Sequence, residues 1–192
     1  MKLLEQRIAR EGKILPGNIV KVDGFLNHRV DTVLLREMAR EFKAHFGGKA
    51  IDLIMTCEAS GIAIATVAAE EFGVPMLFVK KAKSSNLGGD VFTSEIQSYT
   101  YGKTVTLTCS KNWLHEGDRV LIIDDFMARG EAMRGVIDII AQAKAELVGI
   151  GIAIEKGFQE GGDRFRSLGV PYKALAVIDH VEDGKLIFRD EA

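Results

Sequence analysis

The chain has 192 residues, of which 47% are hydrophobic and 27% are charged. That length suits a single domain, and the composition excludes a disordered chain, which combines low hydrophobicity with high net charge. Lys and Arg together number 25 and Asp and Glu 27, so the net charge of −2 excludes binding to nucleic acid through bulk positive charge. Any bound anion must therefore be held by a local site.

The sequence contains no segment that resembles a membrane span or a secretory signal. No apolar run approaches the length of about 18 residues that a membrane span needs, and residues 1–12 mix charges with leucines, which predicts an amphipathic helix. Two cysteines, Cys57 and Cys109, cannot form a disulfide framework. Buried thiols in a reducing compartment account for them more simply. We therefore expect a cytoplasmic protein that contacts no membrane.

Helical and strand-like segments alternate along most of the chain. Helical periodicity with glycine or proline at the ends predicts helices over residues 3–11, 32–46, 62–72, 131–143 and 163–168. Short apolar runs predict buried strands over residues 51–56, 76–79, 120–123, 148–154 and 174–178, with a weaker strand after Gly184. Residues 14–27 are expected to be irregular. The alternation predicts an α/β fold with a central, mainly parallel sheet flanked by helices.

Residues 81–112 form the one inserted piece in this alternation. The preceding strand leads into residues 80–89, which are rich in serine and glycine and predict a mobile basic loop. Its lysines are Lys80, Lys81 and Lys83. Residues 95–101 and 104–109 alternate and contain β-branched and aromatic residues, which predicts a hairpin. We expect the loop and hairpin to act as a flexible lid.

The segment 120–132 carries the strongest functional pattern in the chain. It reads Val-Leu-Ile-Ile-Asp-Asp-Phe-Met-Ala-Arg-Gly-Glu-Ala, which predicts an apolar strand, two acids, a tight loop and a helix. In an open α/β sheet, Asp124 and Asp125 would lie at the carboxyl end of the strand, where ligands bind. The unpaired N–H groups of the helix start, with the helix dipole, favour an anion, and Gly130 permits close backbone approach. A phosphate next to a diol, as in a sugar phosphate, suits both features.

These residues are similar to the phosphoribosyl-pyrophosphate (PRPP) motif of the type I phosphoribosyltransferases. Ala128 and Ala132 stand where most members carry Thr or Ser, and this version resembles the bacterial xanthine phosphoribosyltransferases. Three further segments resemble that subfamily: its amino-terminal hood at residues 21–28, its pyrophosphate loop at residues 58–61 and its base-contacting segment at residues 154–159. The resemblance implies one phosphoribosyltransferase domain over residues 1–192, with a hood at about 14–30 joined by a C-terminal segment, and a lid or hairpin at about 81–112.

The resemblance also implies an activity and assigns roles to residues. The expected reaction transfers the 5-phosphoribosyl group of PRPP to xanthine, giving xanthosine 5′-phosphate and pyrophosphate in purine salvage. Asp124 and Asp125 would face the ribose and stabilise positive charge in the transition state. The residues expected to hold the PRPP phosphate are Ala128, Arg129, Gly130, Glu131 and Ala132. Those expected to contact the base are Val20, Asn27 and Lys156.

Cofactor and assembly follow from the same resemblance. It implies Mg²⁺, held mainly by substrate oxygens and water, so no dense set of protein carboxylates is needed. Because the family is dimeric, we expect a homodimer, with small-molecule substrates and no nucleic acid as partner.

Three alternatives stay open. The accepted base could instead be hypoxanthine, guanine, adenine or orotate. The chain could be a regulator that keeps this fold as a PRPP sensor, although only about 20 residues precede the hood, too few for the winged-helix segment of the purine operon repressor. It could also be an unrelated nucleotide-binding α/β module.

Overall fold

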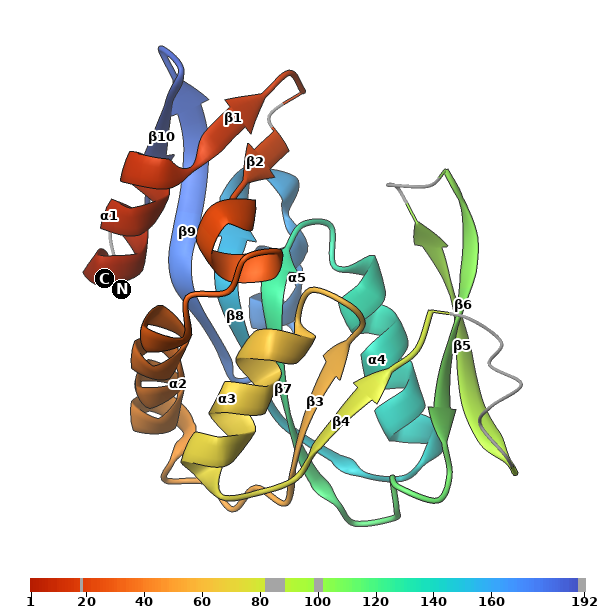
Figure 1. Ribbon diagram of the computed structural model, residues 1–192. Helices are drawn as coiled ribbons and strands as arrows, with labels where there is room; N and C mark the ends of the chain where they lie inside the picture. Colours follow the sequence, from red (N-terminus) through yellow and green to blue (C-terminus); the bar gives the residue numbers. More distant parts are fainter. Residues whose placement is uncertain (18, 82–88, 99–101, 190–192) are drawn as a thin grey trace.

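A six-stranded sheet forms the centre of the molecule (Figure 1). The computed structural model describes residues 1–17, 19–81, 89–98 and 102–189. The strands run in the order β10–β9–β8–β7–β3–β4. Their bounds are Leu53–Cys57 for β3, Met76–Val79 for β4, Arg119–Met127 for β7, Glu146–Lys156 for β8, Tyr172–Glu182 for β9 and Lys185–Phe188 for β10. All neighbouring pairs are parallel except β10 with β9, so the expected mainly parallel sheet is confirmed.

Helices cover both faces of this sheet (Figure 1). They are α1 (Lys2–Glu11), α2 (Thr32–Phe46), α3 (Ile62–Phe72), α4 (Glu131–Gln142) and α5 (Gly161–Ser167). One buried cluster joins the sheet to α1, α2 and α3, and a second joins it to α4 and α5. Leu121 and Ile123 of β7 enter the first cluster, whereas Val120 and Ile122 enter the second. Burial on both faces explains why the strands read as continuous apolar runs.

The segment expected to be irregular contains short regular elements, so that prediction was wrong. Strands β1 (Lys13–Leu15) and β2 (Ile19–Lys21) pair antiparallel, and a π-helical turn, η1 (Asp23–Asn27), follows them. Three-residue strands are too short to show an alternating pattern in sequence. Phe25 and Leu26 of η1 are fully buried and join the first apolar cluster, which fixes the turn against the body of the domain.

The predicted hairpin is present and is tied to α4. Strands β5 (Val91–Ser98) and β6 (Lys103–Ser110) pair antiparallel along their whole length. The guanidinium of Arg134 on α4 donates to the carbonyl of Glu95 at 2.8 Å, and the amide of Gln142 donates to the carbonyl of Thr93 at 2.8 Å. The hairpin is therefore attached to α4 through both bonds, and its action as a flexible lid stays a prediction.

The basic loop expected after β4 lies mostly outside the described residues, because these omit positions 82–88, which include Lys83. Positions 99–101, between the hairpin strands, lie outside them as well. Lys80, which is described, forms an isolated antiparallel bridge with Thr108 of β6. In the described part of the chain, no helix combines the length and apolar character required to cross a bilayer.

Candidate functional site

Strand β7 runs through the paired acids rather than ending before them. It extends to Met127 and stays paired with β8 as far as the Met127–Glu155 pair, so the expected strand end at Ile123 was wrong. Adjacent residues of a strand point to opposite faces. Asp124 and Asp125 therefore have different surroundings, although they are neighbours in sequence.

The Asp124 carboxylate is almost fully enclosed, with 9% of the residue exposed. Its Oδ1 accepts hydrogen bonds from the hydroxyl of Thr56 at 3.1 Å and from the N–H of Asp125 at 3.0 Å. Burial, and next the nearby charge of Asp125, raises the pKa of Asp124. An added positive charge near this group would stabilise its ionised form.

Asp125 links two segments that are far apart in sequence. Its Oδ2 accepts from the side-chain amide of Asn27 at 3.0 Å, and its Oδ1 accepts from the hydroxyl of Ser60 at 3.0 Å. Asp125 is 5% exposed. The structure thus brings Asn27, expected to meet a base, against the second acid.

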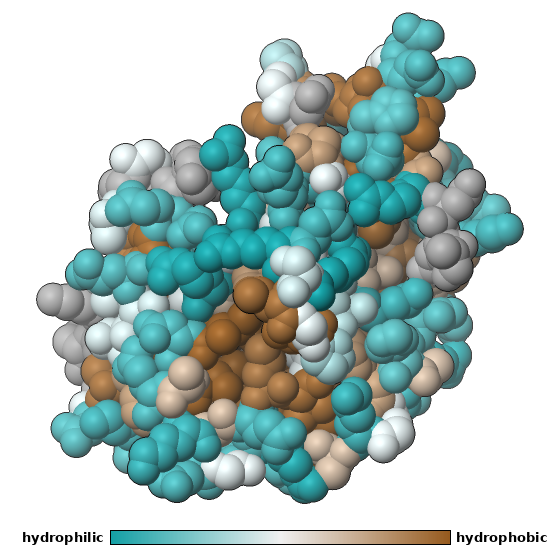
Figure 2. All heavy atoms as spheres, turned by 180° about the vertical axis from the view of Figure 1, so that it is seen from behind, coloured by the Kyte–Doolittle hydropathy of each residue, from teal (hydrophilic) through white to brown (hydrophobic). Residues whose placement is uncertain are grey.

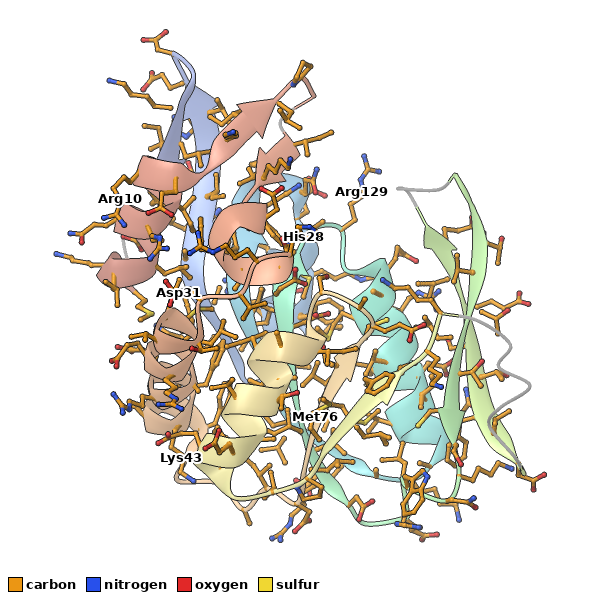
Figure 3. All side chains as sticks on the ribbon, viewed as in Figure 1. Arg10, His28, Asp31, Lys43, Met76 and Arg129 are labelled. Carbon is orange, nitrogen blue, oxygen red and sulfur yellow. The ribbon has the colours of Figure 1, made fainter. Side chains whose placement is uncertain are left out.

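The loop at residues 128–132 turns directly into helix α4. Gly130 precedes the helix with a φ of 84°, a left-handed conformation that favours glycine. No side chain caps the helix, so its first N–H groups lack the partner that a capping residue would supply. Arg129 projects from this loop on the side between the β1–β2 and β5–β6 hairpins (Figure 3). The local geometry is that of an anion site at a helix N-terminus.

A cleft of about 960 Å³ opens over this loop. All five loop residues 128–132 line it, together with Asp124 and Lys156. Ile19 from β2 and Ile96 from β5 also line the cleft. The volume is that of a site for a small organic ligand. Seven of the sequence-predicted site residues therefore share one cavity.

Lys156 is the last residue of β8 and is half-buried. Its Nζ lies 5.6 Å from the centroid of the Phe126 ring, which also lines the cleft. Burial lowers the pKa of the Lys156 ammonium. The group is a strong hydrogen-bond donor next to an aromatic surface, an arrangement that suits a planar ligand with an acceptor oxygen.

Val20 is placed differently from Lys156. Its side chain is 6% exposed and belongs to the first apolar cluster, whereas its neighbour Ile19 is 52% exposed and lines the cleft. The Val20 side chain could therefore contact a base only if it left the core. In this strand, the side chain that faces the cleft is that of Ile19. The sequence did not indicate Ile19, because a strand of three residues is too short to show which of its alternating side chains face the core and which face outward.

Sequence reasoning also missed Glu155, the residue before Lys156. It is 1% exposed, and its carboxylate accepts hydrogen bonds from both terminal nitrogens of Arg166, at 2.8 and 2.6 Å, and from the hydroxyl of Tyr172 at 2.9 Å. A lone glutamate at the end of an apolar run resembles a surface residue in sequence. Only its register in β8 could have indicated burial.

Comparisons with known proteins identify the family of this chain. The family model described as Phosphoribosyl transferase domain matches residues 26–173, and the chain belongs to this family. The chain is 50% identical to the xanthine phosphoribosyltransferase of Ruminiclostridium cellulolyticum, over 99% of this chain and 100% of that protein. It is 48% identical to the xanthine phosphoribosyltransferase of Alkaliphilus metalliredigens, over 100% of this chain and 95% of that protein.

A solved structure shows the same fold. Adenine phosphoribosyltransferase from Rhodothermus marinus superposes with a TM-score of 0.75 at 22% identity, covering 93% of this chain and 100% of that one. At this identity the likeness concerns the fold alone. It includes the mainly parallel sheet flanked by helices that the sequence predicts.

Proposed function

We propose that this chain transfers the 5-phosphoribosyl group of PRPP to xanthine and releases xanthosine 5′-phosphate and pyrophosphate. The observation that carries the proposal is the shared cleft, in which a helix N-terminus at residues 128–132, the Asp124 carboxylate and the Lys156 ammonium face one cavity. Full-length relatives named xanthine phosphoribosyltransferases, at 48% and 50% identity, support the choice of base.

The ribose 5′-phosphate binds at the loop of residues 128–132. The main-chain N–H groups at the start of α4 donate to phosphate oxygens, and the helix dipole favours the negative charge. Ala128 and Ala132 offer no side-chain donor, so the backbone and Arg129 supply the contacts. Glu131 turns its carboxylate toward Arg134 at 3.3 Å, which limits its repulsion of the phosphate.

Asp124 and Asp125 serve the ribose. As the bond to pyrophosphate breaks, positive charge builds on the sugar ring, and a carboxylate in a poorly hydrated site stabilises it strongly. Asp124 acts from the cleft wall, and Asp125 adds its charge from the adjacent position while it holds Ser60.

Lys156, Asn27 and Val20 serve the base. The Lys156 ammonium donates to the 6-oxo group of xanthine and discriminates against the 6-amino group of adenine, which would leave a buried donor unpaired. When the base binds, the side-chain amide of Asn27 gives up its hydrogen bond to Asp125 and donates to the 2-oxo group of xanthine. Val20 contributes through its main chain, because its side chain is in the core.

The residues of the cleft fit Mg²⁺ carried mainly by the substrate. Among the described residues, the carboxylates that line the cleft are those of Asp124 and Glu131, and Mg²⁺ commonly binds through one or two carboxylates, phosphate oxygens and water. Asp124 is a buried carboxylate whose hydrogen-bond donors are both uncharged, so it would hold the ion together with pyrophosphate oxygens. Bound Mg²⁺ supplies charge neutralisation for the leaving pyrophosphate.

We also propose that the enzyme is a cytoplasmic homodimer. Cys57 and Cys109 are free and buried, which supports a reducing compartment. An apolar area ringed by hydrophilic residues occupies the face turned away in Figure 1 (Figure 2), and such areas commonly mark contacts between proteins. Light scattering coupled to size-exclusion chromatography tests the dimer, and a monomer at micromolar concentration would contradict the proposed assembly.

A base panel tests the activity. The protein is incubated with PRPP, Mg²⁺ and either xanthine, hypoxanthine, guanine, adenine or orotate, and nucleotide formation is followed. We expect xanthine to give the highest kcat/KM. Turnover of another base alone would overturn the choice of xanthine, and PRPP binding without turnover of any base would favour a PRPP sensor.

A further inference from the structure

An ion pair between the buried carboxylate of Glu155 and the exposed guanidinium of Arg166 lies near the proposed phosphate loop. Glu155 receives two hydrogen bonds from Arg166 and one from Tyr172, and the Arg166 guanidinium lies 4.4 Å from the centroid of the Tyr172 ring. A bidentate pair of this kind fixes the relative orientation of its two side chains. None of these three residues is among the described residues that line the cleft. Any effect of the pair on a ligand in the cleft therefore passes through other residues.

Arg166 belongs to α5, and the start of this helix is fitted between Glu155 and the loop. The N–H of Gly161 donates to the carbonyl of Ala128 at 3.1 Å. A β-carbon at Gly161 would lie 2.2 Å from that same carbonyl oxygen, and one at Gly162 would lie 2.3 Å from the Glu155 carboxyl group. Both distances are too short for any side chain, so α5 touches the loop on one side and the buried acid on the other.

A second contact joins α5 to the loop at Gly130. The Phe165 ring is 3% exposed, and its edge would lie 2.8 Å from a β-carbon at Gly130. Phe165 immediately precedes Arg166. A rotation or shift of α5 would therefore move the ring that supports Gly130 and the N–H that holds Ala128.

We propose that Glu155 and Arg166 are positioning residues for PRPP: through α5, their ion pair holds the 128–132 loop in the shape that binds the ribose 5′-phosphate. The inference rests on the proposed function of that loop. It assigns the pair an effect on PRPP rather than on the base, because the contacts of α5 reach Ala128 and Gly130. Misplacement of a binding loop by a fraction of an ångström is sufficient for a large kinetic effect.

Steady-state kinetics of Arg166→Met test the proposal. We expect KM for PRPP to rise by about tenfold or more, with KM for xanthine at saturating PRPP unchanged and kcat less affected. Arg166→Lys, which keeps the charge but not the bidentate geometry, should recover part of the loss. The matched control is Arg119→Met. This variant breaks a similar bidentate pair with Asp52 at the amino end of β7, away from the cleft. It should leave both KM values unchanged.

Tyr172→Phe keeps the proposal testable if Arg166→Met fails to fold. It removes one hydrogen bond to Glu155 and retains the ring, and we expect a smaller rise in KM for PRPP in the same direction. If Arg166→Met folds, a normal KM for PRPP in that variant would overturn the positioning role. If only Tyr172→Phe folds, a normal KM for PRPP in Tyr172→Phe would overturn it. Wild-type protein that binds PRPP by calorimetry but does not convert xanthine would contradict the proposed function, while PRPP affinity of the variants would still decide the role of the pair.

Discussion

Asp124 places a carboxylate where water is nearly excluded and where its hydrogen-bond donors are uncharged. Asp124→Asn keeps the shape and removes the charge. Because the charge is needed most when the sugar becomes positive, we expect kcat to fall by about 10²–10³-fold, with a smaller change in KM. Initial rates over a range of PRPP concentrations measure the split. Asp138→Asn, on the exposed face of α4, is the control, and a rise in KM at constant kcat would contradict the assignment.

Lys156 holds a charge in a half-buried position, and burial lowers its pKa. The unfolded chain therefore binds this proton more readily, so the charge opposes folding at neutral pH. In Lys156→Met we expect an unchanged or higher Tm together with a loss of about 10–100-fold in kcat/KM for xanthine, as for a hydrogen bond to a charged donor. Thermal unfolding and xanthine kinetics measure the two effects.

The control for Lys156 is Lys43→Met. Lys43 also places its Nζ near an aromatic ring, 4.5 Å from the centroid of Phe72, but it lies on α2. Its replacement should leave xanthine kinetics unchanged. A lower Tm with normal xanthine kinetics in Lys156→Met would show that the ammonium is structural.

Two routes led from the sequence to site residues: a pattern in consecutive positions, and, for Lys156 and Asn27, the family resemblance. Asp124 and residues 128–132 form one segment, so their shared cleft could be predicted. Glu155 could not be recognised, because its partner Arg166 lies on another element and the pairing depends on tertiary packing. Ile19, and not Val20, places its side chain in the cleft, and this depends on strand phase, which composition does not report.

Strand β8 contacts α2 at Gly151, a position without a side chain. A β-carbon at Gly151 would lie 2.5 Å from Cδ1 of Ile123 and 2.9 Å from the Phe42 ring. We expect Gly151→Ala to lower the free energy of unfolding by about 1–3 kcal/mol through overpacking. Urea titration measures the change. Gly48→Ala, where nothing lies within 4 Å of an added β-carbon, is the control, and an unchanged midpoint for Gly151→Ala would refute the packing argument.

The long elements could be predicted because their apolar periodicity is sustained over several turns or residues, as in α2 and α4. The short elements could not: β1 and β2 have three residues each, and η1 owes its shape to the burial of Phe25 and Leu26. The continuation of β7 through two acids also escaped prediction, since charged residues normally mark the end of a buried strand.

Asp52 and Arg119 join β7 to the segment that enters β3, with hydrogen bonds of 2.7 and 2.6 Å. Hydrogen bonding to Arg119 lowers the pKa of Asp52 to about 2. The Asp52 carboxylate therefore binds a proton less readily in the folded state than in the unfolded state. The stabilisation is present above the unfolded pKa of about 4 and is lost as the pH falls through about 2.

We accordingly expect Asp52→Asn to lower Tm at pH 6, with the difference from wild type shrinking as the pH falls from about 4 to about 2. Thermal scans at a series of pH values measure this. Asp90→Asn, whose 3.8 Å ion pair with Lys111 is highly exposed, should follow wild type throughout. A difference for Asp52→Asn that stays constant down to about pH 2 would contradict the assignment.

In the proposed function, the turn before α4 recognises its ligand mainly through peptide groups rather than side chains. Truncation to alanine would report on Arg129 but would leave Ala128 and Ala132 unchanged, so it would overlook the contribution of the peptide groups. A saturation library should instead return small residues at these two positions and glycine alone at 130, where φ is 84° and Phe165 closes the space. Transplanting this recognition into another scaffold would require copying a backbone path together with the helix that supports it.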